Sequence, residues 1–412
     1  MIQFLMYLSI FIGLFLAYFY LFIFLSKTKE EKPIFEEKKP PKVTIIIPAF
    51  NEEKGIATTI ESALNIDYPK KKLEIIVVDD GSKDNTYKIA LQYKNKGIKV
   101  FTKPNGGKGT ALNLGISKAK GKIIVTMDAD NTHVKPEALK QMVAYFSNPD
   151  VVCVAPVMAV YEPKGILQKI QQVEYLFGIL LRKVFSNINA IHVTPGAFSA
   201  YKKSFFDKFG GFEENNLTED LEMALRIQYN GYSIVNSTEA IIYTVTPNKF
   251  GVLLKQRRRW YGGLVKNLAK YNSLFSKRHG EMGVIILPAA VISVLFSLIL
   301  TPYMLIKSIL NLKDEFEYLQ SINFQVFNSW EFSTTFIERY ILTLVSDPKI
   351  FFLVIFFTSL ALYMIFAKAK LKESLNIKLS LIFFILFYTT LFTLWWFISL
   401  IYIMLNRKIS WR

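Results

Sequence analysis

Four apolar runs bracket one long polar block in this chain of 412 residues. The runs are Phe4–Leu25, Val284–Ile306, Ile341–Phe366 and Leu379–Leu405. Each is long enough to cross a bilayer as a helix, which takes about 20 apolar residues. The first run lacks a basic start and a clear small-residue cleavage site, so we expect a permanent helix and not a signal peptide. The sequence therefore predicts an integral membrane protein with several spans.

The charges beside these runs predict which side of the membrane the polar block occupies. Cytoplasmic loops carry an excess of Lys and Arg, and lysines follow the first run and recur in residues 367–378. The segment 313–339 is acidic and is expected outside. The block from about Pro41 to Gly283 is then cytoplasmic and both termini lie outside, although the basic tail NRKISWR fits that placement poorly.

Composition narrows the range of partners. The formal net charge of +17 favours anionic partners such as lipid headgroups or nucleotides. The basic residues gather near the apolar runs, so we expect no nucleic acid partner. The single cysteine, Cys153, excludes an intrachain disulfide and a cysteine zinc site, and the three scattered histidines show no metal-ligand spacing.

Strands and helices alternate along the polar block. The runs KVTIIIP, LEIIVVDD, IKVFTK and KIIVTMDAD are rich in β-branched residues and are typical of buried strands. Stretches with helical spacing separate them, and this alternation predicts an open α/β sheet. Ligands of such sheets bind at the carboxyl ends of the strands. Two acidic clusters, Asp79-Asp80 and Asp128-Ala129-Asp130, lie at such ends.

Asp128 and Asp130 form a D-x-D pattern at the end of a hydrophobic run. Two carboxylates this close repel each other unless a cation lies between them or water screens them. A hard divalent ion takes oxygen ligands and keeps room for substrate phosphates. A solvated acidic turn explains a lone D-x-D pattern, but at the end of a buried strand we expect metal binding.

The segment NLTEDLEMALRIQYNGY places Glu219, Asp220 and Glu222 at the start of a helical pattern. Thr218 is suited to cap that helix, and acids in the first turn complement its dipole. Alternatively, Asp220 is a general base that removes a proton from an attacking hydroxyl. The residues alone leave both interpretations open.

The stretch LLKQRRRWYGG packs Lys255 and three arginines against Trp260, shortly before the second apolar run. Basic residues that face lipid headgroups beside an interfacial Trp explain this pattern, and so does a grip on a phosphorylated substrate. Residues 165–187 and 250–275 have amphipathic spacing and are too polar to span. We expect helices at the membrane surface there, with packing on the soluble core as the alternative.

The ordered motifs PAFNEE, VVDDGS, NGGKGTALN, DAD, TED and QRRRW resemble those of the membrane-embedded family 2 glycosyltransferases. That group includes cellulose, chitin, hyaluronan and poly-N-acetylglucosamine synthases. The resemblance covers about residues 42–265 and implies an α/β fold of the GT-A type, the nucleotide-diphospho-sugar transferase fold. It also implies a nucleotide-diphosphate sugar as donor, a UDP sugar foremost, with Mg²⁺ or Mn²⁺ and inversion at the anomeric carbon.

For the donor side, the resemblance assigns residues from five of these motifs. Lys108 would approach the nucleotide or its phosphates, and Asp128 and Asp130 would form the metal pair, with Asp130 the better ligand. The residues near the nucleoside would be Pro48, Asn51, Glu52 and one of Asp79 and Asp80, with Asp80 favoured. The fixed positions of the Q-x-x-R-W motif are Gln256, Arg259 and Trp260.

For the acceptor side, the resemblance makes Asp220 the base, with Glu219 and Gly196 near the acceptor. Trp260 offers a flat face on which a sugar ring can stack. Gly196 suits a close approach of a sugar chain, although a tight turn explains it as well. Arg257 and Arg258 fill the variable positions of the motif and are expected to contact lipid or to support the site.

The predicted layout has five parts: a transmembrane helix over 1–26, a charged linker over 27–41, a cytoplasmic GT-A domain over 42–245, interfacial helices over 246–283 and a transmembrane region of about three helices over 284–412. We expect a metal-dependent synthase that extends a polysaccharide, with coupling to export left open. The alternative is transfer of one sugar to a polyprenyl phosphate or another lipid-linked acceptor. A non-catalytic membrane receptor is a third hypothesis, against which the intact Asp128, Asp130, Asp220 and Arg259 argue.

Overall fold

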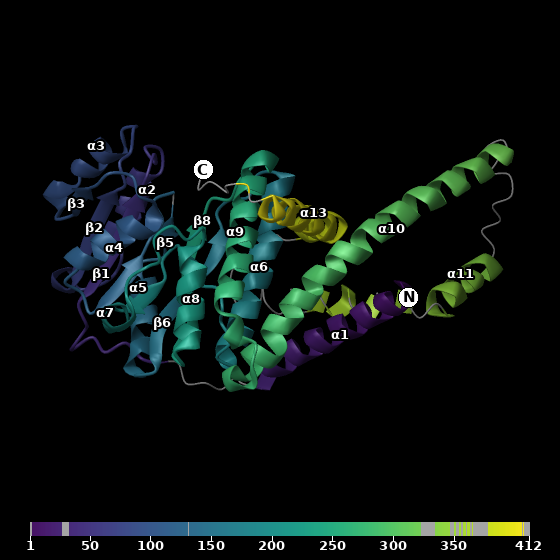
Figure 1. The fold of residues 1–412 in the computed structure, drawn as a ribbon, viewed down its shortest axis with the longest axis horizontal. Coiled ribbons are helices and arrows are strands. Elements are labelled where there is room, and N and C mark those ends of the chain that lie inside the picture. The colour runs from purple at the N-terminus through teal and green to yellow at the C-terminus, as the bar shows by residue number, and fades with distance from the viewer. Residues whose placement is uncertain are drawn as a thin grey trace.

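A computed structural model describes residues 2–26, 33–130, 132–322, 334–346, 378–405 and 407, with parts of 350–365. Figure 1 shows two regions, an α/β region built on one sheet and a set of long helices that project from it. The predicted α/β organisation is therefore confirmed.

The first half of the sheet consists of the four predicted strands. They are β1 (Val43–Ala49), β2 (Leu73–Asp79), β3 (Lys99–Thr102) and β4 (Ile123–Thr126). They are parallel and lie in the order β3-β2-β1-β4. Helices α2 (Ile56–Leu64), α3 (Thr86–Leu91) and α4 (Lys108–Lys118) connect them. Ala49 lies opposite Asp79, so the carboxyl ends of β1 and β2 meet at one edge.

The second half of the sheet is mixed. β7 (Ala200–Lys202) runs antiparallel to β4 and to β6 (Val151–Val160), β8 (Ser233–Thr244) is parallel to β6, and β5 (His133–Val134) is the antiparallel edge strand. Helices α5 (Ala138–Ala144), α7 (Lys203–Phe209) and α8 (Glu219–Tyr229) complete this half.

The core lies on both faces of the sheet. Ile45 and Ile47 of β1 belong to one buried cluster, and Ile46, between them, belongs to the other. Successive side chains of a strand point to opposite faces, so a continuous apolar strand serves both clusters. All seven residues of β1 are buried, as expected for a central parallel strand.

Both predicted amphipathic helices form, as α6 (Ile166–Asn187) and α9 (Phe250–Lys270). α6 packs against β6 and β8 on one side and against the C-terminal helix α13 (Lys378–Met404) on the other. α9 packs against α8 and α13. Figure 1 shows α6 and α9 between the sheet and the apolar helices. Their location at a membrane surface stays a prediction.

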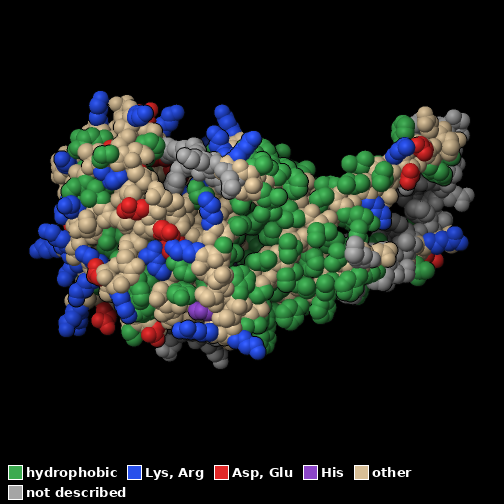
Figure 2. All heavy atoms as spheres, viewed as in Figure 1, with side chains coloured by type: hydrophobic (Ala, Val, Ile, Leu, Met, Phe, Trp, Pro, Cys, Tyr) green, Lys and Arg blue, Asp and Glu red, His purple; other side chains and the backbone are tan. Residues whose placement is uncertain are grey.

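Among the described residues, three helices are long and apolar enough to cross a membrane: α1 (Ile2–Ser26), the helix that becomes α10 (Leu287–Ser321), and α13. They correspond to the first, second and fourth predicted spans, although α10 continues well past Ile306. The third predicted span lies partly outside the described residues, and nearly all of the lysine-rich loop after it lies outside them. Within the described part, α11 (Thr334–Ser346) covers the start of that span. Figure 2 shows hydrophobic side chains over the projecting helices and most Lys and Arg over the α/β region.

Candidate active site

A cleft of about 580 Å³ opens at the carboxyl ends of β1, β2 and β4. Five of the sequence motifs contribute to its walls. The predicted site residues that line it are Pro48, Glu52, Asp80, Lys108, Asp128, Asp130 and Arg259. Five of these residues lie at or just after the ends of β1, β2 and β4, which meet there because the three strands are parallel neighbours. Lys108 begins α4, and Arg259 comes from α9.

The two aspartates at the end of β2 have different surroundings. The Asp80 carboxylate lines the cleft and accepts hydrogen bonds from the Lys103 ammonium at 2.6 Å and the Gly107 backbone N–H at 2.7 Å. Asp79 accepts from the Thr102 hydroxyl at 2.9 Å and is not among the described residues that line the cleft. This placement agrees with the preference for Asp80.

Lys108 begins α4 and joins acids from two motifs. Its ammonium nitrogen lies 2.7 Å from Asp128 Oδ1 and 3.0 Å from Glu219 Oε1. Burial alone lowers the pKa of Lys108, but the charges of Asp128, Glu219 and Asp220 outweigh it and raise that pKa. The sequence predicted Lys108 beside the nucleotide; the structure places it in the cleft wall, where it also links the D-x-D pair to the TED segment.

Gly196 lies directly against this cluster. A Cβ built on Gly196 would be 2.7 Å from Lys108 Nζ and 2.9 Å from Asp220 Oδ2. Its carbonyl accepts from Thr126 at the end of β4. The absence of a side chain at Gly196 therefore allows Lys108 and Asp220 to approach each other.

Asp220 lies at the start of α8, and its carboxylate accepts from the backbone N–H of Leu221 at 2.8 Å. Burial and the adjacent charge of Glu219 raise the pKa of Asp220 to about 6, while Lys108 and Arg259 oppose the rise. An acid with a pKa near the working pH is suited to proton transfer. The pKa fits a general base, whereas Asp220, Glu219 and Gly196 are not among the described residues that line the cleft.

Thr218 occupies the position before α8, as predicted, but the prediction that its side chain caps the helix is wrong. Its hydroxyl makes no cap hydrogen bond and accepts instead from the Asn267 amide of α9 at 3.0 Å. The competing partner explains the difference. A Cβ built on Gly263 would be 2.2 Å from the Thr218 hydroxyl, so this glycine lets α9 pass close to the start of α8.

The donor set at the cleft fits a hard divalent cation. The Asp130 side chain is accessible from the cleft, and protein atoms surround it on its other sides. That enclosure and the like charges of Asp128 and Glu52 raise the pKa of Asp130. The described residues contain no group of three or more His, Cys, Asp or Glu side chains placed to hold a metal. Mg²⁺ or Mn²⁺ on the D-x-D pair would take its other ligands from phosphates and water.

The residues of the QRRRW motif lie on α9 in different surroundings. Arg259 reaches the cleft and donates to the Leu217 carbonyl at 3.1 Å. Gln256 and Trp260 are partly buried and, like Asn51, are not among the described residues that line the cleft. Arg257 is 2% exposed, so of its two predicted roles the lipid contact is wrong and the supporting role is left. It contacts side chains of α6 and α13 instead.

Glu222 is a buried acid that the sequence assigned only to helix-dipole stabilisation. Its carboxylate accepts hydrogen bonds from Arg226 one turn later and from the Tyr271 hydroxyl after α9. Arg226 also donates to the carbonyls of residues 209–211. This network fixes α8 to the end of α9. The i,i+4 spacing of Glu222 and Arg226 was the available sequence signal.

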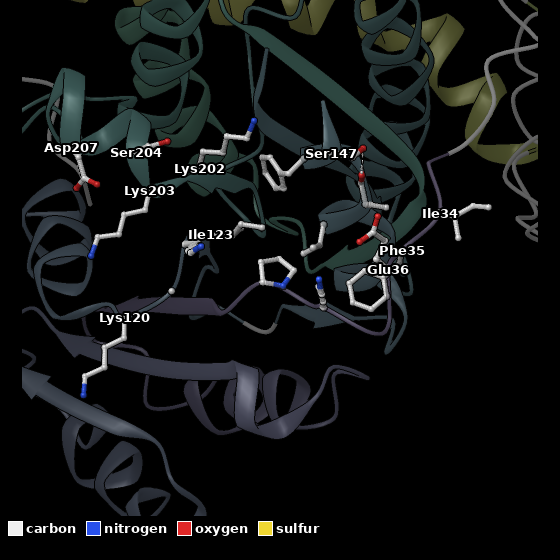
Figure 3. A pocket seen from close by; sticks show the side chains of 17 residues that line it. Ile34, Phe35, Glu36, Lys120, Ile123, Ser147, Lys202, Lys203, Ser204 and Asp207 are labelled. Atoms are coloured by element: carbon white, nitrogen blue, oxygen red, sulfur yellow. Dashed lines mark hydrogen bonds between the residues drawn. The ribbon is translucent and has the colours of Figure 1, made fainter. Parts of the chain in front are cut away.

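A second cavity, of about 670 Å³, lies at the opposite edge of the sheet, where β1 and β4 begin (Figure 3). Several lysines line it, but in Figure 3 the Lys120, Lys202 and Lys203 side chains do not converge on one point. Lys202 and Lys203 donate to backbone carbonyls of residues 148, 149 and 119. The cavity thus lacks the convergent acids and cation of the first cleft.

The mixed sheet and the acidic cleft at its parallel strand ends define a domain of the GT-A type. Residues 44–210 match the family described as Glycosyl transferase family 2. This part of the chain is therefore similar to family 2 glycosyltransferases, as the motifs indicated.

Several curated proteins are similar to the chain. It is 35% identical over 254 residues to the probable glycosyltransferase YdaM of Bacillus subtilis, which covers 58% of this chain and 60% of that protein. It is 32% identical over 233 residues to the poly-beta-1,6-N-acetyl-D-glucosamine synthase of Staphylococcus epidermidis, with 55% and 56% covered. The matched part thus spans less than two thirds of these relatives.

A solved structure has a similar fold. The mannosyltransferase PcManGT of Pyrobaculum calidifontis, solved with GDP-Man and Mn²⁺, superposes with a TM-score of 0.58. The identity is 20%, and the match covers 89% of this chain and 98% of that one. The likeness therefore concerns the fold.

Proposed function

We propose that this chain transfers a sugar, with inversion, from a nucleotide-diphosphate donor to a growing polysaccharide at a membrane. One observation carries the proposal: Lys108 and Gly196 bring the D-x-D pair at the end of β4 together with Asp220 of α8 beside one open cleft. This arrangement supplies a base on one side and a cation-binding, phosphate-binding wall on the other.

In the proposed reaction Asp220 accepts the proton of an acceptor hydroxyl. The hydroxyl oxygen then attacks the anomeric carbon, the bond between that carbon and the phosphate oxygen breaks, and the nucleoside diphosphate leaves with both bonding electrons. Attack opposite the leaving group inverts the anomeric centre. Arg259 and Lys108, both in the cleft wall, stabilise the negative charge that grows on the diphosphate.

Asp128 and Asp130 would hold Mg²⁺ or Mn²⁺, which when bound neutralises charge on the diphosphate. Glu52 and Asp80 line the part of the cleft assigned to the nucleoside. Trp260, next to Arg259, is the stacking platform for the acceptor sugar. We also propose that Glu219 and Gly196 lie on the acceptor side, as the motifs predicted.

The apolar helices support a membrane location for the reaction. α1, α10 and α13 are each suited to span, and α6 and α9 connect the cleft domain to them. We propose that the cleft faces the cytoplasm, where nucleotide sugars are made, and keep the predicted five-part layout. Two of the named similarities, a poly-N-acetylglucosamine synthase and a mannosyltransferase with GDP-Man, make UDP-N-acetylglucosamine and GDP-mannose the first donors to test.

The test is the size of the product. Membranes that contain the protein would be incubated with radiolabelled nucleotide sugars and Mg²⁺ or Mn²⁺, with Asp220→Asn as the control. A long or laddered product that is absent from the control supports a polymer synthase. A single short product that extracts into organic solvent supports transfer to a lipid-linked acceptor instead. No nucleotide release from any donor would contradict the catalytic proposal.

A further inference from the structure

We propose that Arg257, a variable position of the QRRRW motif, is a positioning residue that holds the Trp260 ring for the acceptor and ties it to α13. The inference rests on the proposed function and deepens it. It assigns control of acceptor engagement to a buried ion pair outside the cleft.

Arg257 and Glu174 form a two-point ion pair between α9 and α6. The guanidinium nitrogens Nη1 and Nη2 lie 2.7 and 2.6 Å from the two carboxylate oxygens of Glu174. The Arg257 side chain is 2% exposed and that of Glu174 is 17% exposed. A planar guanidinium with both ends bound cannot rotate, so the pair fixes the register of α9 against α6.

The same guanidinium contacts two tryptophan rings. Its central carbon lies 4.4 Å from the ring centroid of Trp260, one turn along α9, and 5.2 Å from that of Trp395 on α13. Trp395 is fully buried, whereas Trp260 retains accessible surface. A desolvated cation against an indole is a strong and directional contact. Arg257 therefore sets the orientation of the one ring that remains reachable.

α13 reinforces this arrangement at three further points. The Tyr388 hydroxyl lies 3.3 Å from Glu174 Oε1, and the Ser380 hydroxyl donates to Gln172 of α6 at 2.8 Å. Trp396 stacks on Tyr261, which follows Trp260, with ring centroids 4.4 Å apart. α13, which is suited to span the membrane, thus contacts Arg257 before Trp260 and Tyr261 after it.

Arg259 connects this arrangement to the cleft, because it lies in the cleft wall and Trp260 follows it. The Arg259 guanidinium is held separately by the Leu217 carbonyl at 3.1 Å, whereas the Trp260 ring is held by Arg257. Loss of the Glu174–Arg257 pair should therefore release the Trp260 ring more than Arg259. We expect such a loss to weaken use of the acceptor much more than binding of the donor.

The test compares Arg257→Lys with Arg258→Lys. Lys keeps the charge but loses the planar fork. Arg258 is the matched control, because it is the next residue of α9 and contacts an aromatic ring of α13, Tyr402, at 4.1 Å, but not Trp260. Purified full-length protein in detergent would be assayed with its donor and with short oligomers of the transferred sugar as acceptor.

We expect Arg257→Lys to lower kcat/KM for the acceptor about tenfold, with the donor KM changed less than twofold, and Arg258→Lys to leave both unchanged. In a Trp260→Ala background Arg257→Lys should have no further effect, because the residue acts through that ring. Equal losses for donor and acceptor, or effects that multiply in the double variant, would overturn the inference.

A second variant guards against simple unfolding. Glu174→Gln keeps the shape of the side chain and should show the same split between acceptor and donor at a temperature below its measured unfolding midpoint. An unchanged acceptor KM in folded Glu174→Gln would contradict the role of the ion pair. Failure of the wild-type protein to transfer sugar from any donor would overturn the proposed function itself, which the variants do not address.

Discussion

The ammonium group of Lys108 lies 2.7 Å from the Asp128 carboxylate, so the D-x-D motif has a partner within the protein. The same ammonium reaches Glu219, which precedes Asp220. Acids from β4 and α8 are thereby held together although like charges repel. A divalent cation and a donor diphosphate would change this balance, because the first competes for Asp128 and the second for Lys108.

The raised pKa of Asp220 predicts an acidic limb in the rate profile. A base must be deprotonated, so kcat/KM should fall about tenfold per pH unit below a pKa of about 6 and level off above it. Lys108 lowers this pKa, so Lys108→Gln should move the limb to higher pH. Initial rates between pH 5 and 8 measure both; a flat profile would remove Asp220 as the base.

Gly196→Ala should inactivate the enzyme without unfolding it. The new methyl group would displace Lys108 and Asp220, and a shift of about 1 Å at a reacting group can cost roughly 100-fold in rate. Gly251→Ala is the control, because its Cβ would meet nothing within 4 Å. Comparable activities of the two variants would show that the contact at Gly196 has no catalytic consequence.

Asp130→Asn should weaken the dependence on Mg²⁺ or Mn²⁺. Loss of one ligand charge should raise the metal concentration for half-maximal activity by at least about tenfold. Chelator treatment followed by metal titration measures this, with nucleotide binding followed separately. A titration curve that coincides with that of the wild type would exclude Asp130 as a ligand.

Glu222→Gln should lower stability, because it leaves Arg226 without its buried partner. Breaking a buried ion pair in this way costs about 3–5 kcal/mol, and Glu222 is fully buried. The exposed Lys313–Glu317 pair has the same i,i+4 spacing, so Glu317→Gln is the control and should change little. Thermal unfolding of the full chain in detergent distinguishes the two; equal midpoints would contradict the structural role of Glu222.

Local sequence patterns predicted the first, parallel half of the sheet well. The β-branched runs that became β1, β2 and β4 are buried on both faces, and such strands can be recognised from composition alone. Their acidic ends then placed Asp80 and Asp128 at one edge. The four strands of the second half, β5 to β8, went unpredicted. β5 and β7 carry too few residues to give a pattern, Pro156 interrupts the apolar run of β6, and β8 contains polar residues such as Asn236 and Glu239.

Contacts between distant segments could not be predicted from such patterns. Arg257 in a basic run resembles a lipid contact, and only the fold shows that Glu174, 83 residues earlier, neutralises it. The Thr218 hydroxyl has a local helix cap available, yet Asn267 of a later helix binds it. In both cases tertiary packing selected one of several partners that the residue type allows.

The length of α10 has a consequence for the far side of the membrane. Its 35 residues span about 50 Å, whereas the hydrocarbon core is about 30 Å thick. Tilts of up to about 40° do not absorb that difference. If α10 spans the membrane as proposed, its last turns, which carry Lys313, Asp314 and Glu317, would extend beyond the hydrocarbon core into water. Water-soluble reagents applied from that side would then reach these turns, so labelling of α10 would report which compartment lies opposite the cleft.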